Sequence, residues 1–280
     1  MKILVVTPTR GRSPWLSETI ATVSAYAPGA QHVLVAPSDS IADLQRRFPP
    51  LTISPEPAGG GGMYAAINAG AASSADWDAI TYINDDDLLC PGFAAVVEAM
   101  RDTDLRRVPL FAYGRVALID GKGRRVGAIP ISSHPASNRL LYAQQIEPVY
   151  QHGTLFSYGA WHELGGCDAG LRLCGDSDLL ARACLAAIPA RAVHAQVASF
   201  RLHPVQLSQS RAAMHAERAA VDAKLQLVAS RIGLRHTFAR WWFRIANVSV
   251  YAERLARHGW KTFDEVLSAG GAAPPTNGAH

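Results

Sequence analysis

The stretch DAITYINDDD, residues 78–87, is an apolar run with β-strand character that ends in three consecutive carboxylates. Side chains alternate along a regular strand, so a loop at the strand end is needed to bring two or three of these carboxylates together. Adjacent carboxylates repel one another, and a divalent cation with oxygen ligands makes such clustering favourable. The stretch therefore predicts a Mg²⁺ or Mn²⁺ site at Asp85, Asp86 and Asp87. The alternative is a solvated acidic turn that caps the following helix.

Composition places the chain among ordinary globular enzymes. Its 280 residues are 49% hydrophobic and 18% charged, enough for one large α/β domain or two small ones. A formal charge of +4 suits anionic ligands such as nucleotide diphosphates. No basic run is interleaved with aromatic residues in a known reading motif, so we expect no nucleic-acid partner.

Three features indicate a cytoplasmic protein. The four cysteines have no CxxC spacing, which favours reduced thiols. Residues 2–6 form an apolar strand signal directly after Met1, without the basic and apolar regions of a signal peptide. No apolar run reaches the length of a membrane span.

Strand and helix signals alternate in the first half of the chain. Short apolar runs at residues 2–6, 32–35 and 51–53 predict strands, and the segments after Pro14 and over residues 40–48 predict helices. The glycines of residues 59–62 predict a loop that leads into a helix, whose N-terminal amides would suit a phosphate or a sugar. No Lys-Ser or Lys-Thr follows, so this is not a Walker loop.

The second half departs from strict alternation. Residues 110–120 and 124–129 predict a hairpin, and residues 154–158 and 192–202 predict further strands. Helices are expected over residues 91–100, 137–145, 179–187 and 210–228.

A second acidic site precedes the helix expected at residues 179–187. Asp176 and Asp178 are candidates for chemistry there, although Asp at a helix start also serves as a cap. Asp178 and Arg182 have the i,i+4 spacing of an ion pair. His203, directly after the last expected strand, is a candidate ligand or a structural loop histidine.

The composition from Arg235 onward becomes basic and aromatic, with Trp241, Trp242, Phe243 and Tyr251 among several arginines. Such a helix lies at a membrane interface or packs back on the domain, and we favour packing. Residues 270–280 are expected to be disordered.

Several motifs occur in the order found in family 2 glycosyltransferases with a GT-A fold, which residues 1–220 resemble. TPTRGR at 7–12 is similar to the family's T-P-T-x-N-R loop, and GMYAAINAG at 62–70 to its G-x-Y-x-A-x-N-x-G segment. NDDD at 84–87 resembles the metal motif. GGCD at 165–168, GDSDLLAR at 175–182 and RLHP at 201–204 resemble the late motifs.

The resemblance implies an α/β fold with a Rossmann-like mixed sheet flanked by helices and a C-terminal helical extension. We expect a catalytic domain over residues 1–232, a basic aromatic helical extension over 233–268 and a disordered tail over 269–280. Two departures stand out. The acidic D-D-G-S segment is replaced by VAPSDS at 35–40, where Asp39 substitutes from a shifted position, and the Glu of the family's E-D pair is Gly175.

The resemblance also implies an inverting, metal-dependent glycosyltransferase that uses a UDP, GDP or dTDP sugar and an acceptor hydroxyl of unknown identity. By motif position, Asp176 is the catalytic base, and Asp86 with Asp85, Asp87 and His203 holds Mn²⁺ or Mg²⁺. The residues expected to bind the donor are Thr7, Pro8, Thr9, Arg12, Asp39, Tyr64, Asn68, Asn84 and Asp85. Similar proteins commonly act in bacterial surface polysaccharide synthesis, which is compatible with a position at the inner face of the membrane through the C-terminal helix.

Two other functions fit parts of the sequence. A nucleotidyltransferase on a related scaffold would need a basic glycine-rich loop after the first strand, and residues 7–12 are a poor version of one. A catalytically inactive protein that binds a nucleotide sugar or a partner would explain the missing acids at Ala36 and Gly175, but Asp86 and Asp176 are retained.

Overall fold

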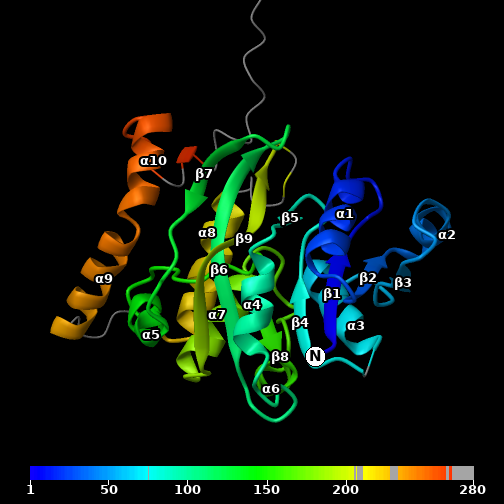
Figure 1. The fold of residues 1–280 in the computed structure, drawn as a ribbon, viewed down its shortest axis with the longest axis horizontal. Helices are drawn as coiled ribbons and strands as arrows, with labels where there is room; N and C mark the ends of the chain where they lie inside the picture. Colours follow the sequence, from blue (N-terminus) through cyan, green and yellow to red (C-terminus); the bar gives the residue numbers. More distant parts are fainter. Residues whose placement is uncertain (75, 205, 207–210, 228–232, 263–264, 267–280) are drawn as a thin grey trace, which may run out of the picture.

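A computed structural model describes residues 1–74, 76–204, 206, 211–227, 233–262 and 265–266. These residues form one mixed sheet with helices on both faces (Figure 1). Two further helices, at the left of Figure 1, stand beside the strand β7 (Arg125–Ile129).

The described residues contain a nine-stranded sheet in the order β3-β2-β1-β4-β8-β6-β9-β5, with β7 paired to β6. Its first four strands run parallel: β1 (Ile3–Pro8), β2 (Gln31–Ala36), β3 (Thr52–Pro55) and β4 (Ala79–Tyr82). The rest are β5 (Leu88–Leu89), β6 (Phe111–Asp120), β7 (Arg125–Ile129), β8 (Leu155–Ser157) and β9 (Ala190–Leu202). Strand β8 is antiparallel to both β4 and β6, and β9 is parallel to β6.

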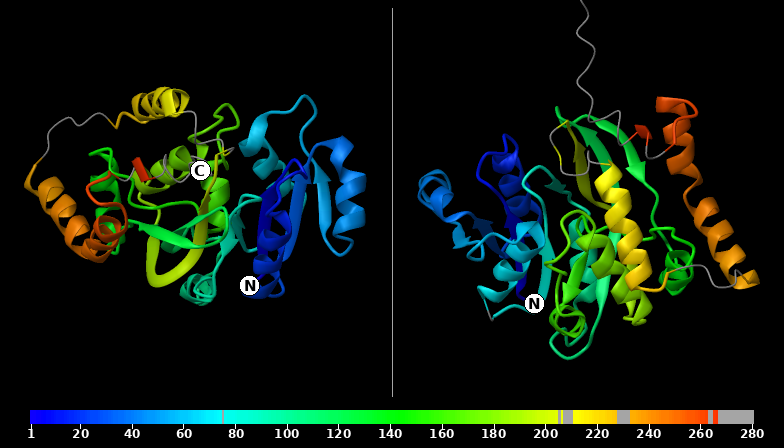
Figure 2. Two further views of the ribbon diagram at one scale, coloured as in Figure 1. Left: turned by 90° about the horizontal axis from the view of Figure 1, so that it is seen from above. Right: turned by 180° about the vertical axis from the view of Figure 1, so that it is seen from behind.

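Successive side chains of a strand point to opposite faces of the sheet, and here both sets are apolar, so helices cover both faces. Leu4 and Val6 pack in one core cluster with α3 (Gly62–Ala72), α6 (Tyr158–Leu164) and α7 (Gly175–Leu185). Val5 packs in another with α1 (Leu16–Tyr26) and α4 (Phe93–Met100). Helix α8 (Arg211–Lys224) lies on the α7 side (Figure 2), and α2 (Ser38–Arg47) flanks β3.

The strand directions bring several loops to one edge of the sheet. Strands β1, β4 and β9 run the same way, so the loops that follow them meet at this edge. Because β8 runs the opposite way, the segment before it lies at the same edge. The loop after β3 leads into the start of α3, which adds a helix N-terminus. Ligand sites of open α/β sheets lie at the carboxyl ends of the parallel strands.

The structure confirms the α/β fold class and the expected hairpin, which is β6 and β7. Two expectations about helices were wrong in detail, and one helix was not expected. Helix α7 begins at Gly175 rather than at residue 179, so the acidic pair lies inside its first turn. Helix α5 (Asn138–Tyr142) follows the 3₁₀ turn η1 (Pro135–Ser137) and is shorter than expected. Helix α6 was not expected, because its short apolar sequence follows a strand without a break.

Two helices near the C-terminus, α9 (Leu234–Ala246) and α10 (Val248–His258), form the pillar at the left of Figure 1. The buried amide of Asn247 between them donates to the carbonyl of Ile131 at 2.8 Å and accepts from the N–H of Ile131 at 3.1 Å. Glu253 of α10 accepts two hydrogen bonds of 2.8 Å from Arg125 of β7. Among the described helices, none is long and apolar enough to span a membrane. The ends of the helix expected at 210–228, and the tail from 267 onward, lie outside the described residues.

The buried histidine of β2 predicts a specific loss of stability in acid. His32 is buried beside Thr7, at 2.9 Å between Nε2 and Oγ1, and burial lowers the pKa of His32 to about 4. The unfolded chain, with an ordinary histidine pKa of about 6.5, binds the proton first, so stability falls as the pH drops below 6.5.

We expect wild type to lose about 2 kcal/mol more unfolding free energy than His32→Gln between pH 7 and pH 5. Urea unfolding of both proteins at the two pH values measures this difference. Equal pH dependence of wild type and variant would contradict the assignment of a neutral buried His32.

Candidate active site

The acidic stretch forms the loop after β4, and its first carboxylate is held by the loop after β1. Thr9 donates its hydroxyl to Asp85 Oδ2 at 2.5 Å, and Ser13 donates to the main-chain carbonyl of Asp85 at 2.7 Å. Burial raises the pKa of Asp85 to about 6, with the charges of Asp86 and Asp87 acting in the same direction and the Thr9 hydrogen bond opposing them. The loop after β1 thus orients Asp85, which remains partly exposed.

Asp87 points into the protein and is completely buried. Its Oδ1 accepts the N–H of Arg201 at 2.9 Å, and its Oδ2 accepts from the Asn84 amide at 3.2 Å. His152 Nε2 lies 3.3 Å from the same Oδ2. Burial raises the pKa of Asp87, whereas the pKa of His152 is raised because Asp87 and other nearby acids together outweigh the burial of the imidazole. Asp87 therefore joins the loop to neighbouring elements from inside.

Asp86 is the middle acid and turns the other way, toward the loop after β9. Its Oδ2 lies 2.7 Å from Nε2 of His203, whose ring packs 4.5 Å from Trp15. The buried Nδ1 of His203 has no hydrogen-bond partner among the described residues. A carboxylate and an imidazole are both ligands of divalent transition metals. No group of three or more His, Cys, Asp or Glu side chains suited to a metal occurs in the part of the chain that is described.

That donor set fits Mn²⁺ or Mg²⁺ bound together with a diphosphate. These cations commonly take one or two protein carboxylates and complete their coordination with substrate phosphates and water. Asp86 and His203 would supply the protein ligands, with Asp85 beside them.

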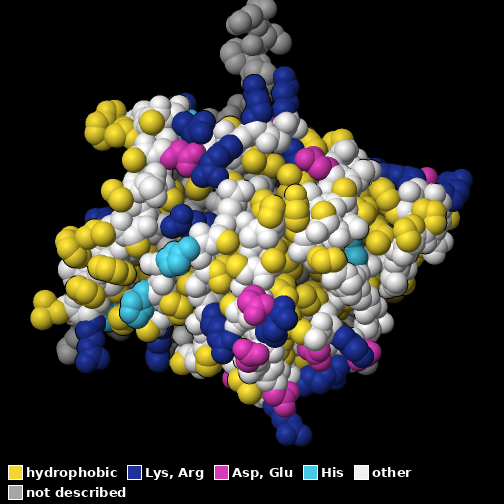
Figure 3. Space-filling view, viewed as in Figure 1, with side chains coloured by type: hydrophobic (Ala, Val, Ile, Leu, Met, Phe, Trp, Pro, Cys, Tyr) yellow, Lys and Arg dark blue, Asp and Glu magenta, His cyan; other side chains and the backbone are white. Residues whose placement is uncertain are grey.

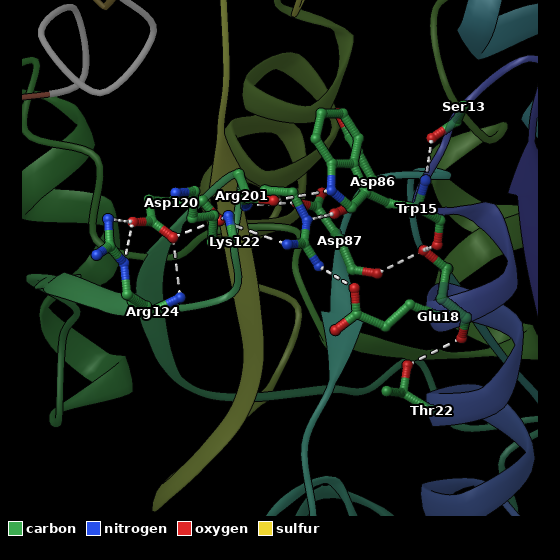
Figure 4. Close-up of polar contacts among 12 residues, drawn as sticks. Ser13, Trp15, Glu18, Thr22, Asp86, Asp87, Asp120, Lys122, Arg124 and Arg201 are labelled. Carbon is green, nitrogen blue, oxygen red and sulfur yellow. Dashed lines mark hydrogen bonds and ion pairs between the residues drawn. The ribbon is translucent and has the colours of Figure 1, made fainter. Parts of the chain in front are cut away.

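Arg201 of β9 ties this loop to α1 and to the hairpin (Figure 4). Although only 1% of its side chain is exposed, it donates from Nε to the carbonyl of Asp86 at 2.8 Å and from Nη2 to Glu18 at 2.6 Å. Its Nη1 lies 3.4 Å from the carbonyl of Asp120 at the end of β6, and its guanidinium stacks over Trp15. One arginine thus connects the main chain of Asp86 to α1 and to the end of β6.

Asp176 lies in the first turn of α7, where Tyr64 of α3 donates its hydroxyl to Oδ1 at 3.1 Å. The neighbouring Gly175 explains the missing acid of the motif, because a Cβ at this position would lie 2.6 Å from the Tyr64 ring. The tyrosine ring occupies the space that any side chain at position 175 would need. Tyr64 is expected near the donor, and in the structure its hydroxyl contacts Asp176.

His152 lies beside the acidic loop, with Nε2 3.3 Å from Asp87 Oδ2. Burial lowers the pKa of His152, but the interaction with Asp87, together with the charges of Asp176 and Asp86, raises it overall. This residue belongs to the segment before β8, and the strand directions bring that segment to the same edge as the acidic loop. Its Nδ1 has no hydrogen-bond partner among the residues described.

The start of α7 is held by charged side chains from other elements. Ser177 donates to Glu147 at 2.5 Å, and Arg218 of α8 lies 3.4 Å from the same carboxylate. The predicted pair of Asp178 and Arg182 is present at 2.7 Å. Asp178 is completely buried, so its carboxylate stabilises α7 through Arg182 and is not available to a ligand in solvent.

Of the other residues expected to bind the donor, some bind protein groups and some are exposed. Thr7 is buried with its hydroxyl on His32, and both ends of the Asn68 amide bind the main chain of Cys167, at 2.8 and 2.9 Å. Three others are exposed or half-buried near the ends of β1 and β2: Pro8 is the last residue of β1, Arg12 lies in the loop after it, and Asp39 lies in the first turn of α2.

Arg201, His152 and Glu147 are the residues that sequence reasoning missed. Arg201 was visible as the first letter of RLHP, but its burial against the loop was not. His152 and Glu147 occupy a stretch without a recognisable motif, so only the packing of the sheet edge identifies them.

Comparisons with known proteins bear on the fold. No family model and no curated protein matches the chain. Among solved structures, Staphylococcus aureus TarS aligns at a TM-score of 0.56 and 12% identity, over 95% of this chain and 46% of TarS. The chain spans about half the length of TarS. TarS 1–349 in complex with UDP gives 0.54 and 12%, over 95% of this chain and 77% of that one.

A third similar structure is the mannosyltransferase PcManGT from Pyrobaculum calidifontis in complex with GDP-Man and Mn²⁺. It aligns at a TM-score of 0.57 and 14% identity, over 96% of this chain and 79% of PcManGT. The fold is therefore a GT-A-like glycosyltransferase fold.

Arg201 predicts a large stability difference between two partners of one ion pair. We expect Arg201→Met to lower the unfolding free energy by about 2–4 kcal/mol, because it leaves the carbonyl of Asp86 without its donor. Glu18 is half-exposed and glutamine keeps an oxygen acceptor for Nη2, so Glu18→Gln should cost about 1 kcal/mol. Urea unfolding at one pH measures both changes. Equal losses in the two variants would show that Arg201 acts only as a partner of Glu18.

Proposed function

We propose that this protein is a metal-dependent glycosyltransferase, which moves a sugar from a nucleotide-diphosphate donor to an acceptor hydroxyl with inversion. One observation carries the proposal: in a glycosyltransferase fold, the loops after β4 and β9 bring Asp86 to 2.7 Å from His203, and Tyr64 of α3 holds Asp176 at the start of α7. The first pair suits a leaving diphosphate, and the second suits an incoming hydroxyl.

The metal ligands we propose are Asp86 and His203, with Asp85 assisting directly or through water. A divalent cation held there would act as a Lewis acid that offsets charge on the departing diphosphate. Asp87 is the member of the original trio that the geometry favours least, since both of its oxygens already face protein groups.

A UDP, GDP or dTDP sugar is the donor we propose, and the fold similarity to complexes with UDP and GDP-Man supports this class. The loops after β1 and β2 would contact the nucleotide, through Thr9, Pro8, Arg12 and Asp39. Thr9 also orients Asp85, so that donor contacts and metal ligands are positioned together.

Asp176 is the proposed base. It would accept the proton of the acceptor hydroxyl as the oxygen forms its bond to the anomeric carbon, and the diphosphate would leave with the electron pair of the broken bond. Tyr64 holds one carboxylate oxygen in place. Attack from the face opposite the diphosphate gives inversion. Synthesis of a bacterial surface polysaccharide is a setting that suits this chemistry.

An inactive protein that binds a nucleotide sugar is the second candidate, and the glycine at position 175 favours it. The contact between Gly175 and the Tyr64 ring weakens this argument, because it gives the glycine a packing reason. Hydrolysis or transfer of the donor separates the two functions.

The donor and the metal can be tested by thermal shift with UDP, GDP, dTDP, CDP and their sugars, each with and without Mn²⁺. At about 100 times its Kd, a ligand stabilises the native state by about 2.7 kcal/mol. We expect a Mn²⁺-dependent rise in melting temperature with one nucleotide.

Asp86→Asn should abolish the Mn²⁺ dependence of this shift. Asp43→Asn, an exposed acid of α2, is the matched control and should behave as wild type. No shift with any nucleotide, or an unchanged response to Mn²⁺ in Asp86→Asn, would overturn the assignment of the metal site.

Removal of the base should separate binding from transfer. Asp176→Asn is expected to keep the nucleotide shift and to lower turnover by about 10²–10⁴-fold, the usual contribution of general base catalysis. Asp168→Asn changes a nearby acid that pairs with Lys224 and should retain turnover within a few fold. Donor turnover followed by nucleotide release measures both, and normal turnover in Asp176→Asn would exclude it as the base.

A further inference from the structure

Helix α9 is apolar on two opposite sides. Ala239 and Phe243 face inward and pack against Leu141 of α5. The outward side carries Leu234, Phe238, Trp241 and Ile245, a set we call the α9 stripe, which lies at the i, i+4, i+7 and i+11 spacing of one helix face. Its members are between 43% and 90% exposed. Packing on the domain, which the sequence favoured, therefore accounts for only one side of the helix.

The exposed apolar surface continues beyond α9. Trp242 is 42% exposed beside the stripe, and Val248 and Leu255 of α10 are also exposed. Apolar side chains gather along the left edge of the molecule over these two helices (Figure 3). Trp260 follows α10 and is almost fully exposed. A contiguous apolar surface of this kind marks an interaction site.

Basic side chains border the α9 stripe. At 100° per residue, Arg235 lies at one margin and Arg244 at the other, with Arg240 farther round the helix on the side of Arg244. None of these three arginines makes an ion pair with another described residue. Residues 234–261 contain six Lys or Arg and one acid, Glu253, which Arg125 and Arg257 already neutralise.

We propose that the α9 stripe docks on an anionic lipid surface. Tryptophan, phenylalanine and leucine would enter the boundary between headgroups and acyl chains, while the arginines extend along them to the phosphates. A second copy of this chain fits less well, because its own stripe would present further arginines and no free acid in return. The helix lies in the surface and does not cross it.

The anchored side of α9 links this surface to the candidate active site. Its inner face contacts Leu141, and Gln144 of the same segment donates to the carbonyl of His236 at 2.9 Å. That segment continues to Glu147, which contacts Ser177 beside Asp176. The inference does not depend on the proposed function, because docking requires no nucleotide.

Sedimentation of the full chain with lipid vesicles tests the proposal. We expect binding to vesicles of equal parts phosphatidylglycerol and phosphatidylcholine, weaker binding in high salt, and little binding to phosphatidylcholine alone. The double variant Phe238→Ser, Trp241→Ser should weaken binding by about 10-fold or more, because it removes the apolar area that enters the bilayer. The double variant Arg235→Gln, Arg244→Gln should weaken it by about 5-fold per arginine.

Val108→Ser is the matched control, since it removes an exposed apolar side chain outside the stripe and should leave vesicle binding unchanged. Melting temperatures equal to wild type show that the stripe variants are folded. Absence of binding to anionic vesicles, or equal binding by the stripe variants, would overturn the proposal. A concentration-dependent dimer that Phe238→Ser abolishes, without vesicle binding, would assign the stripe to a second copy instead.

Discussion

The burial of the Asp87 carboxylate is the constraint on which the rest of the site depends. A buried carboxylate needs polar partners, and Asp87 has the main-chain N–H of Arg201 at 2.9 Å and the imidazole of His152 at 3.3 Å. These two residues come from β9 and from the segment before β8. Satisfying one carboxylate therefore fixes the acidic loop against two other parts of the sheet.

Once Asp87 is held inside, its neighbours have defined directions. Asp85 turns to the hydroxyl of Thr9, and Asp86 turns to His203. The repulsion expected of three adjacent carboxylates is reduced because they take separate partners. Asp85 and Asp86 therefore stay partly exposed at the site, while the buried Asp87 holds the loop against the protein interior.

The apolar α9 stripe and the candidate site lie on different structural elements. The site is built from loops on a buried sheet, whereas the stripe is built on a helix that touches the sheet domain by one side only. Asn247 and the pair of Arg125 with Glu253 hold this helical pillar in place. Helix α9 is packed on the protein by its inner face and is apolar on its exposed face, which suits the proposed docking on a lipid surface.

The sequence by itself determined the alternation of strands and helices, the acidic loop at residues 84–87 and the candidate acid at position 176. These features are local: an apolar run of strand length, a glycine cluster or a row of carboxylates is read from adjacent residues. It also placed Asp178 and Arg182 as a pair, since one helical turn fixes their separation.

Only the tertiary structure decided which acids face outward, because strand order determines what lies beside each loop. It brought His152 and Arg201 to Asp87 from 65 and 114 positions away. It turned Thr7 and Asn68 toward the interior and explained Gly175 by the ring of Tyr64. It also showed that α9 packs by one face and exposes the other, since helical periodicity gives the faces of a helix but not the neighbours that cover them.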